Sequence, residues 1–158
     1  MNNKQTRVSF ILVTKDRPEL AKNAIENIKD IITENDELIL VDGGSRSIDH
    51  PLINKRIQES DKSPGHAINK GIMIAEGKYI RTVSDDDIIR KKQLNEAIKI
   101  MDDNKSIDFL VCGGIRERDN EIYPFFIPKG SNYGSSINDI AKYGACGQGF
   151  IIRTKSIS

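Results

Sequence analysis

Short apolar runs alternate with segments of helical periodicity along this chain. Val8–Val13 is apolar, branched and bounded by polar residues, which is typical of a buried strand. Apolar residues then recur at helical spacing over Glu19–Ile32, and Pro18 suits the first turn of that helix. Asp36–Val41 has the pattern of a second strand. This order predicts two parallel strands joined by a right-handed crossover through the helix.

The same alternation continues through the middle of the chain. His66–Ala75 has a helical pattern, and we expect Gly77 to stop that helix because glycine commonly comes just after helix ends. Lys78–Val83 has the pattern of a strand. Lys91–Met101 predicts a further helix, since its apolar residues fall on one face.

The pattern is less regular in two other parts of the chain. Ser47–Ser60 fits either a short helix after Asp49 or a brief strand around Arg56–Gln58. The elements expected after residue 105 are strands over Ile107–Val111, Ile122–Ile127 and Phe150–Arg153, and a short helix over Ile137–Tyr143. Pro124 favours an edge position for the strand that contains it, because proline cannot donate a ladder hydrogen bond.

The order of these elements predicts one α/β domain over residues 1–158. Helices that alternate with buried strands pack on both faces of a mainly parallel, twisted sheet, so we expect three layers. No internal repeat, low-complexity tract or long linker divides the sequence. A chain of 158 residues is long enough to bury one core.

The composition narrows the classes of function. The chain is 37% hydrophobic and 30% charged with a net charge of +1, which argues against disorder and against a nucleic-acid partner. Cys112 and Cys146 have no Cys or His at zinc-ligand spacing, so we expect reduced thiols in a cytoplasmic protein. No segment approaches the ~20 apolar residues of a membrane span. Peripheral association with a membrane stays open.

Polar loops come directly after three of the expected strands, namely Thr14–Arg17, Asp42–Ser45 and Ser84–Asp87. Ligands of such sheets bind outside the carboxyl ends of the strands, so neighbouring strands would bring these loops into one cleft. Asp85, Asp86 and Asp87 repel one another, and a fold that gathers them usually offers a compensating cation. Hard carboxylate ligands favour Mg²⁺ or Mn²⁺, which would hold a phosphorylated ligand.

Each of these loops also has a plainer interpretation. Asp42 before two glycines fits an ordinary turn. One aspartate of Ser84–Asp87 would be enough to cap the next segment of the chain. Two nucleotide-binding motifs are excluded, because the chain has neither Gly-x-Gly-x-x-Gly after its first strand nor Gly-x-x-x-x-Gly-Lys-Ser/Thr.

Six short motifs occur in a fixed order over residues 8–90. They are Val13-Thr-Lys-Asp-Arg17, Val41-Asp-Gly-Gly-Ser45, Asp61-Lys-Ser-Pro-Gly65, Ala67-Ile-Asn-Lys-Gly-Ile72, Gly77-Lys-Tyr-Ile80 and Ser84-Asp-Asp-Asp87. Each motif is weak, but their order and spacing together resemble the GT-A fold glycosyltransferases often called family 2. Gly147–Arg153 is similar to the glycine-rich strand on the acceptor side of these enzymes. The resemblance implies a donor-binding half over 1–90 and a partial acceptor half over 91–158.

The resemblance also implies roles for residues around a nucleotide. Thr14 would line the nucleotide pocket, and Asp42 would read the base. Asp61 would sit beside the nucleotide, while Asn69 would anchor the helix beneath the pocket. Lys15 stands where the family commonly has an aromatic residue, which puts stacking on the base in doubt.

The aspartate triplet corresponds to the family's metal motif. By resemblance, Asp85 would approach the ribose or the sugar, and Asp86 would bind the Mg²⁺ or Mn²⁺ that bridges the diphosphate. Asp87 would support that metal or cap the segment after the turn. Ser84 replaces the first aspartate of the motif, so metal binding would depend more heavily on Asp86.

The implied activity is inverting, metal-dependent transfer of a sugar from a nucleotide-diphosphate donor to a hydroxyl. The transferred group would be hexosyl or N-acetylhexosaminyl, with UDP the favoured nucleotide and GDP and dTDP as the alternatives. The acceptor would be a glycan or a lipid-linked glycan in surface polysaccharide synthesis. The divalent ion would act as a Lewis acid that neutralises the departing diphosphate.

Two other functions stay open. The family's general base lies beyond the glycine-rich strand, and the chain ends at Ser158 shortly after that strand. A truncated or catalytically impaired nucleotide-sugar-binding module is therefore the alternative, and we assign no catalytic base. A nucleotidyltransferase would need a basic, glycine-rich loop after the first strand, where Thr14–Pro18 offers only Lys15 and Arg17.

Overall fold

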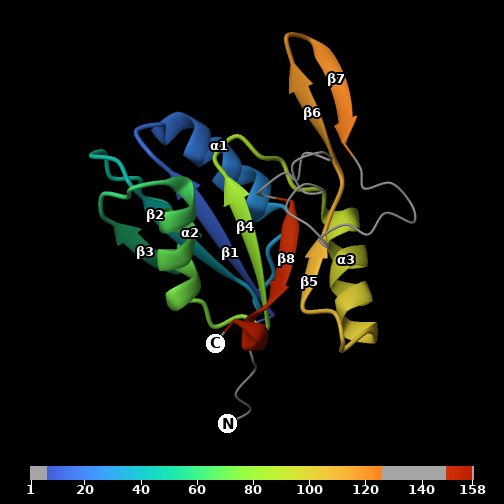
Figure 1. Cartoon of the computed structure of the whole chain (residues 1–158). Helices are drawn as coiled ribbons and strands as arrows, with labels where there is room; N and C mark the ends of the chain where they lie inside the picture. Colours follow the sequence, from blue (N-terminus) through green and yellow to red (C-terminus); the bar gives the residue numbers. More distant parts are fainter. Residues whose placement is uncertain (1–6, 126–148, 158) are drawn as a thin grey trace.

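The computed structural model describes residues 7–125 and 149–157, and its centre is a six-stranded sheet (Figure 1). The strand order is β3-β2-β1-β4-β8-β5. These strands are β1 (Val8–Thr14), β2 (Glu37–Asp42), β3 (Lys55–Gln58), β4 (Tyr79–Ser84), β5 (Phe109–Val111) and β8 (Phe150–Arg153). β8 is antiparallel to both of its neighbours, and the other pairs are parallel. The prediction of a mainly parallel sheet is confirmed.

Helices cover both faces of this sheet. α1 (Pro18–Lys29) and α3 (Lys91–Asp103) pack on one face, and α2 (Pro64–Met73) packs on the other (Figure 1). Two separate clusters of buried side chains fill the two interfaces. The side chains of β1 alternate between them, with Phe10 in the first cluster and Ile11 in the second. This is the three-layer α/β architecture predicted from the sequence.

A second, two-stranded sheet projects beyond the first (Figure 1). It consists of β6 (Gly114–Arg118) and β7 (Glu121–Phe125), which pair antiparallel. β7 is the strand expected around Pro124. β6 was not expected, because its sequence Gly-Ile-Arg-Glu-Arg lacks the alternation of apolar and polar residues that marks a half-buried strand.

The structure resolves one other expectation and corrects another. The ambiguous segment Ser47–Ser60 contains a strand, β3, rather than a helix. α2 ends at Met73, so Gly77 does not stop it, and that prediction was wrong. Gly77 instead allows close packing, because an added Cβ there would lie 2.5 Å from the Ser9 backbone nitrogen. The helix expected over Ile137–Tyr143 lies outside the described residues, as does Cys146.

Gly71→Ala is expected to destabilise the protein, although alanine normally favours a helix over glycine. Gly71 faces the sheet from α2, where an added Cβ would overlap the Ile11 side chain and lie 3.2 Å from Val41 Cγ2. Such overpacking should cost about 1–3 kcal/mol in the free energy of unfolding, measured in urea. Gly65→Ala in the same helix is the control, since its Cβ would meet only Ser63 Oγ at 3.9 Å. Equal stability of both variants would contradict this account of the packing.

A buried polar network lies at the amino end of the sheet and centres on Glu37. Its Oε1 accepts hydrogen bonds from Ser9 Oγ at 2.5 Å and from the Glu76 backbone N–H at 2.7 Å. Lys55 Nζ lies 2.9 Å from the other carboxylate oxygen. Burial alone would raise the pKa of Glu37, but these three partners outweigh it and hold the pKa below its ordinary value.

This network should contribute stability that is lost in acid. A carboxyl group with a lowered folded-state pKa stabilises the protein above its unfolded pKa, and that contribution disappears as the pH falls through the folded value. For Glu37→Gln, the free energy of unfolding should therefore fall less steeply than wild type as the pH drops below 4.5, the ordinary glutamate pKa. Urea titrations at several pH values measure this slope. Glu19→Gln, on the exposed face of α1, is the control, and an unchanged slope for Glu37→Gln would contradict the role of the network.

Candidate functional site

The carboxyl ends of β1, β2 and β4 meet at one edge of the sheet. β1 lies between the other two strands, and Thr14 at its end pairs with Asp42 at the end of β2. On the other side, Val13 pairs with Ser84 at the end of β4. The three polar loops predicted to converge therefore do so, at the carboxyl ends of these parallel strands (Figure 1).

Asp42 presents a buried carboxylate at this edge. Only 2% of the residue is exposed, and its Oδ1 accepts a hydrogen bond from the Gly44 N–H at 2.8 Å. Its Oδ2 is also buried, but it has no hydrogen-bond partner within the described parts of the chain. Leaving a buried acceptor unpaired costs about 1–3 kcal/mol. Asp42 is thus available to accept a hydrogen bond from a bound molecule.

The two glycines that follow Asp42 have no side chain, and this lets Asp16 and Asp61 approach the end of β2 closely. A Cβ on Gly44 would lie 2.6 Å from the Asp16 backbone nitrogen and 3.1 Å from Asp42 Oδ1. The Asp61 carboxylate packs directly against Gly43, where any side chain would collide with it. The structure therefore brings Asp61 to the end of β2, beside Asp42, as the predicted site requires.

Asp16 is a residue of this edge that the sequence pattern did not reveal. Its φ of 55° lies in the left-handed region, which aspartate adopts more readily than most residues. Its Oδ1 accepts a hydrogen bond from the Ser45 N–H at 3.2 Å. Asp16 therefore ties the β1–α1 loop to the loop after β2. A polar residue in a short loop gives little sequence signal for such a contact.

Asp85 is buried behind the β1–α1 loop. It is 3% exposed, and its Oδ2 accepts a hydrogen bond from Thr14 Oγ1 at 2.6 Å. Its Oδ1 lies 2.7 Å from Arg17 Nη2, which makes an ion pair although the two groups are not aligned as a hydrogen bond. The predicted residues Thr14 and Asp85 thus contact each other, whereas their partner Arg17 was not among the predicted site residues.

The other two aspartates of the triplet differ in exposure. Asp86 is exposed, and no side chain or backbone group of the described chain pairs with its carboxylate. Asp87 is half-buried, and its Oδ2 accepts a hydrogen bond from the Ser84 N–H at 3.0 Å. Burial raises the pKa of Asp87, and the charges of Asp86 and Asp85 add to this rise.

The arrangement fits a divalent cation that arrives with its ligand. Within residues 7–125 and 149–157, no three His, Cys, Asp or Glu side chains form a ready-made metal cage. Mg²⁺, however, usually binds through one or two carboxylates together with substrate phosphates and water. Asp86 offers a free carboxylate for that purpose, with Asp87 next to it. Asp85 is already occupied by Thr14 and Arg17.

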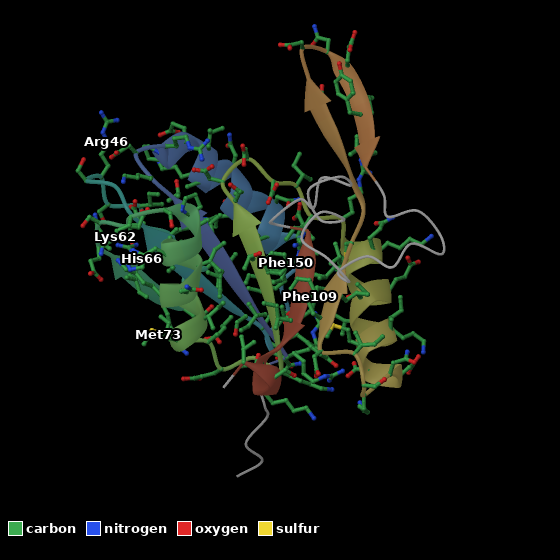
Figure 2. The ribbon with its side chains drawn as sticks, viewed as in Figure 1. Arg46, Lys62, His66, Met73, Phe109 and Phe150 are labelled. Atoms are coloured by element: carbon green, nitrogen blue, oxygen red, sulfur yellow. The ribbon has the colours of Figure 1, made fainter. Side chains whose placement is uncertain are left out.

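The predicted residue Asn69 lies on α2 and, within the described part of the chain, makes no hydrogen bond with the aspartates at the strand ends. Asn69 is exposed on the helix surface. The start of α2 is fixed by Ser63, whose Oγ accepts a hydrogen bond from the His66 N–H at 3.1 Å. The His66 ring in turn accepts from the Lys62 N–H, and Figure 2 shows both side chains at this end of the helix. His66 thus shapes the loop that carries Asp61.

The expected acceptor side contains an aromatic pair. Phe109 of β5 and Phe150 of β8 stack with their ring centroids 5.1 Å apart (Figure 2). Cys112 beside them is a free thiol whose pKa is raised by burial. In the described parts of the chain, no helix is long and apolar enough to cross a membrane.

A family model and several curated relatives match this chain. The model described as glycosyl transferase family 2 matches residues 9–157. An uncharacterised glycosyltransferase of Methanocaldococcus jannaschii is 31% identical over 115 residues, covering 65% of this chain and 40% of the relative. Another from Rickettsia felis is 32% identical over 110 residues, covering 65% and 18%. The chain therefore spans less than half the length of these relatives.

Two solved structures have a similar fold. The mannosyltransferase PcManGT from Pyrobaculum calidifontis, in complex with GDP-Man and Mn²⁺, has a TM-score of 0.57 and 21% identity. That match covers 72% of this chain and 36% of the other. Residues 1–349 of S. aureus TarS, in complex with UDP-GlcNAc, have a TM-score of 0.65 and 19% identity, with 94% and 45% covered. These likenesses show that the fold is GT-A-like.

Proposed function

Because the chain belongs to glycosyl transferase family 2, we propose that it binds a nucleotide-sugar at the carboxyl ends of β1, β2 and β4. The bound sugar would then be transferred to a hydroxyl group of an acceptor. The observation that carries this proposal is the unpaired, buried Oδ2 of Asp42, which lies at the same edge of the sheet as the free carboxylate of Asp86. One group suits the base or ribose of a nucleotide, and the other suits the cation on its phosphates.

We assign roles to the residues around this edge accordingly. Asp42 accepts a hydrogen bond from the base, and Asp61 lies beside the nucleotide. Thr14 and Asp85 form the floor between them through their mutual hydrogen bond, and Asn69 belongs to the helix that supports the loop of Asp61. These roles define a donor half over 1–90, with residues 91–158 as part of the acceptor half.

Asp86 would hold the divalent cation, with Asp87 as its neighbour. The ion, Mg²⁺ or Mn²⁺, would neutralise the negative charge that develops on the departing nucleoside diphosphate. Asp87 keeps the turn closed through Ser84, and its raised pKa means that it loses its proton at a higher pH than an ordinary aspartate. The chain's own contribution is therefore to present one exposed carboxylate on a fixed turn.

The finer points of the proposal come from the resemblance to the family. UDP is the nucleotide that the family resemblance favours, with GDP and dTDP as alternatives. The fold neighbours TarS and PcManGT are in complex with UDP-GlcNAc and GDP-Man, so UDP and GDP are the two to test first. We propose inverting transfer of a hexosyl or N-acetylhexosaminyl group to a glycan or lipid-linked acceptor in polysaccharide synthesis. A cytoplasmic location and contact with a membrane surface belong to the same proposal.

Asp42→Asn is expected to weaken nucleotide binding about tenfold to about a hundredfold, because an amide replaces the acceptor oxygen of a charge-assisted hydrogen bond. Calorimetric titration with UDP and GDP measures this loss. Asp49→Asn is the matched control, since the Asp49 side chain is fully exposed and pairs only at 3.4 Å with Arg56. Unchanged affinity in Asp42→Asn would remove Asp42 from the site.

A binding measurement does not show sugar transfer, so transfer is tested in a separate experiment. UDP- and GDP-sugars are incubated with the protein and Mn²⁺, and release of the nucleoside diphosphate is measured with and without hydroxyl acceptors. Acceptor-dependent release would support a transferase. Saturable binding without any release would instead favour the nucleotide-sugar-binding module.

A further inference from the structure

We propose that Arg17 is a positioning residue: through Asp85, it holds the Ser84–Asp87 turn in the shape that presents Asp86 to a cation. This inference rests on the proposed function, because the cation is the one expected on a nucleotide diphosphate. It assigns Asp85 a supporting role behind the turn. Arg17 was not expected from the sequence, and the resemblance placed Asp85 near the ribose or the sugar rather than behind the turn.

Asp85 is the buried anchor of the turn. Its side chain is completely shielded from solvent, and a buried carboxylate is costly unless a cation or several donors compensate it. Thr14 supplies one donor at 2.6 Å, and Arg17 supplies the positive charge at 2.7 Å. Thr14 is the last residue of β1, and Arg17 belongs to the loop that follows it. The turn after β4 is therefore attached to that loop at Asp85.

The turn is held on two sides and is free at Asp86. Asp87 closes it from within, since its N–H donates to the Ser84 carbonyl at 3.1 Å and its Oδ2 accepts from the Ser84 N–H. Thr14 and Arg17 hold it from outside through Asp85. Asp86 lies between these anchors with an exposed, unpaired carboxylate. A ligand residue held this way is oriented by its neighbours.

Arg17 itself is partly exposed, and its loop has a second attachment. The Arg17 side chain is 49% exposed, so its removal opens no cavity, but it leaves the buried Asp85 carboxylate with the Thr14 hydroxyl and without a positive charge. Urea unfolding is therefore measured for each Arg17 variant to show that it is folded under the conditions of the test. The same loop is tied to the end of β2 independently, through the Asp16 carboxylate and the Ser45 N–H. Loss of Arg17 should therefore loosen the Asp86 side of the site and leave the Asp42 side in place.

The test distinguishes the Asp86 side of the site from the Asp42 side. UDP and GDP affinities are measured with Mn²⁺ and with EDTA for wild type, Arg17→Ala and Arg17→Lys, and amide hydrogen exchange over residues 84–87 is measured without ligand. Arg46→Ala is the matched control, since Arg46 is exposed and projects into solvent from the next loop (Figure 2). A general loss of positive charge near the site would affect both arginine variants.

We expect Arg17→Ala to lose about tenfold or more of the affinity gained with Mn²⁺, which is the size of loss typical when a residue that orients a metal ligand from outside the coordination shell is removed. Its affinity in EDTA should equal that of wild type, exchange over 84–87 should accelerate, and Arg17→Lys should recover part of both properties. Unchanged exchange would overturn the proposal, as would an equal loss in EDTA, which would make Arg17 a direct ligand contact. If wild type binds no nucleotide, the proposed function fails, and the exchange data alone decide whether Arg17 holds the turn.

Discussion

Asp86→Ala should eliminate the Mn²⁺-dependent part of nucleotide binding and lower any transfer rate about a hundredfold or more. Asp86 has the one exposed and unpaired carboxylate of the triplet, whereas Asp85 is paired with Thr14 and Arg17. Removing a single preorganised group that stabilises developing charge typically costs this much in rate. Calorimetry with UDP and GDP, in Mn²⁺ and in EDTA, measures the change in binding directly. Release of the nucleoside diphosphate measures the rate.

The control for this variant is Asp103→Ala at the end of α3, where the carboxylate pairs with Lys99 on the helix surface. The Asp86→Ala protein should unfold at the wild-type urea concentration, since the Asp86 carboxylate has no partner among residues 7–125 and 149–157. Full metal dependence in Asp86→Ala would show that the cation is held elsewhere. The role of the Ser84–Asp87 turn would then have to be abandoned.

Arg153→Met should lower the free energy of unfolding by about 3–5 kcal/mol, since each buried carbonyl left unpaired costs about 1–3 kcal/mol. Arg153 is 2% exposed, and its Nη2 donates to the carbonyls of Met101 at 2.7 Å and Ile107 at 2.9 Å. The guanidinium also lies 5.3 Å from the centre of the Tyr79 ring. One side chain of β8 therefore joins α3, β4 and the segment before β5.

Urea unfolding of Arg153→Met and Arg153→Lys tests this arrangement. Lysine should be nearly as damaging, because a single ammonium cannot reproduce the planar fork that reaches several acceptors at once. Lys155→Met, two residues farther along and exposed, is the control. A loss below about 1 kcal/mol for Arg153→Met would mean that the carbonyls find other partners.

Much of the candidate site was predictable because it depends on strand order. Polar residues directly after apolar runs must lie at the carboxyl edge of a parallel sheet, and this places Thr14, Asp42 and Asp86 together. The strands and helices of the central layers were predictable for a related reason. Apolar runs in the strands and the helical spacing of apolar residues are properties of each segment alone.

The missed features depend on contacts between distant segments. Arg17 and Asp85 are far apart in sequence, and nothing near either residue indicates that they pair. Arg153 comes after two isoleucines and looks like the polar end of a strand, yet it is buried beneath α3. Ile74 and Ala75 continue the helical pattern beyond Met73, so Gly77 was expected to be the stop. Glycine is required at position 77 because a side chain there would collide with Ser9 of the neighbouring strand β1.

The most direct test of a donor site at this edge is calorimetric titration of the wild-type protein with UDP and GDP, first in EDTA and then in Mn²⁺. We predict saturable binding of one of these nucleotides, strengthened by Mn²⁺, with the gain absent from Asp86→Ala. A folded wild-type protein that binds neither nucleotide under either condition would contradict the proposed function and leave the GT-A-like sheet without a donor site.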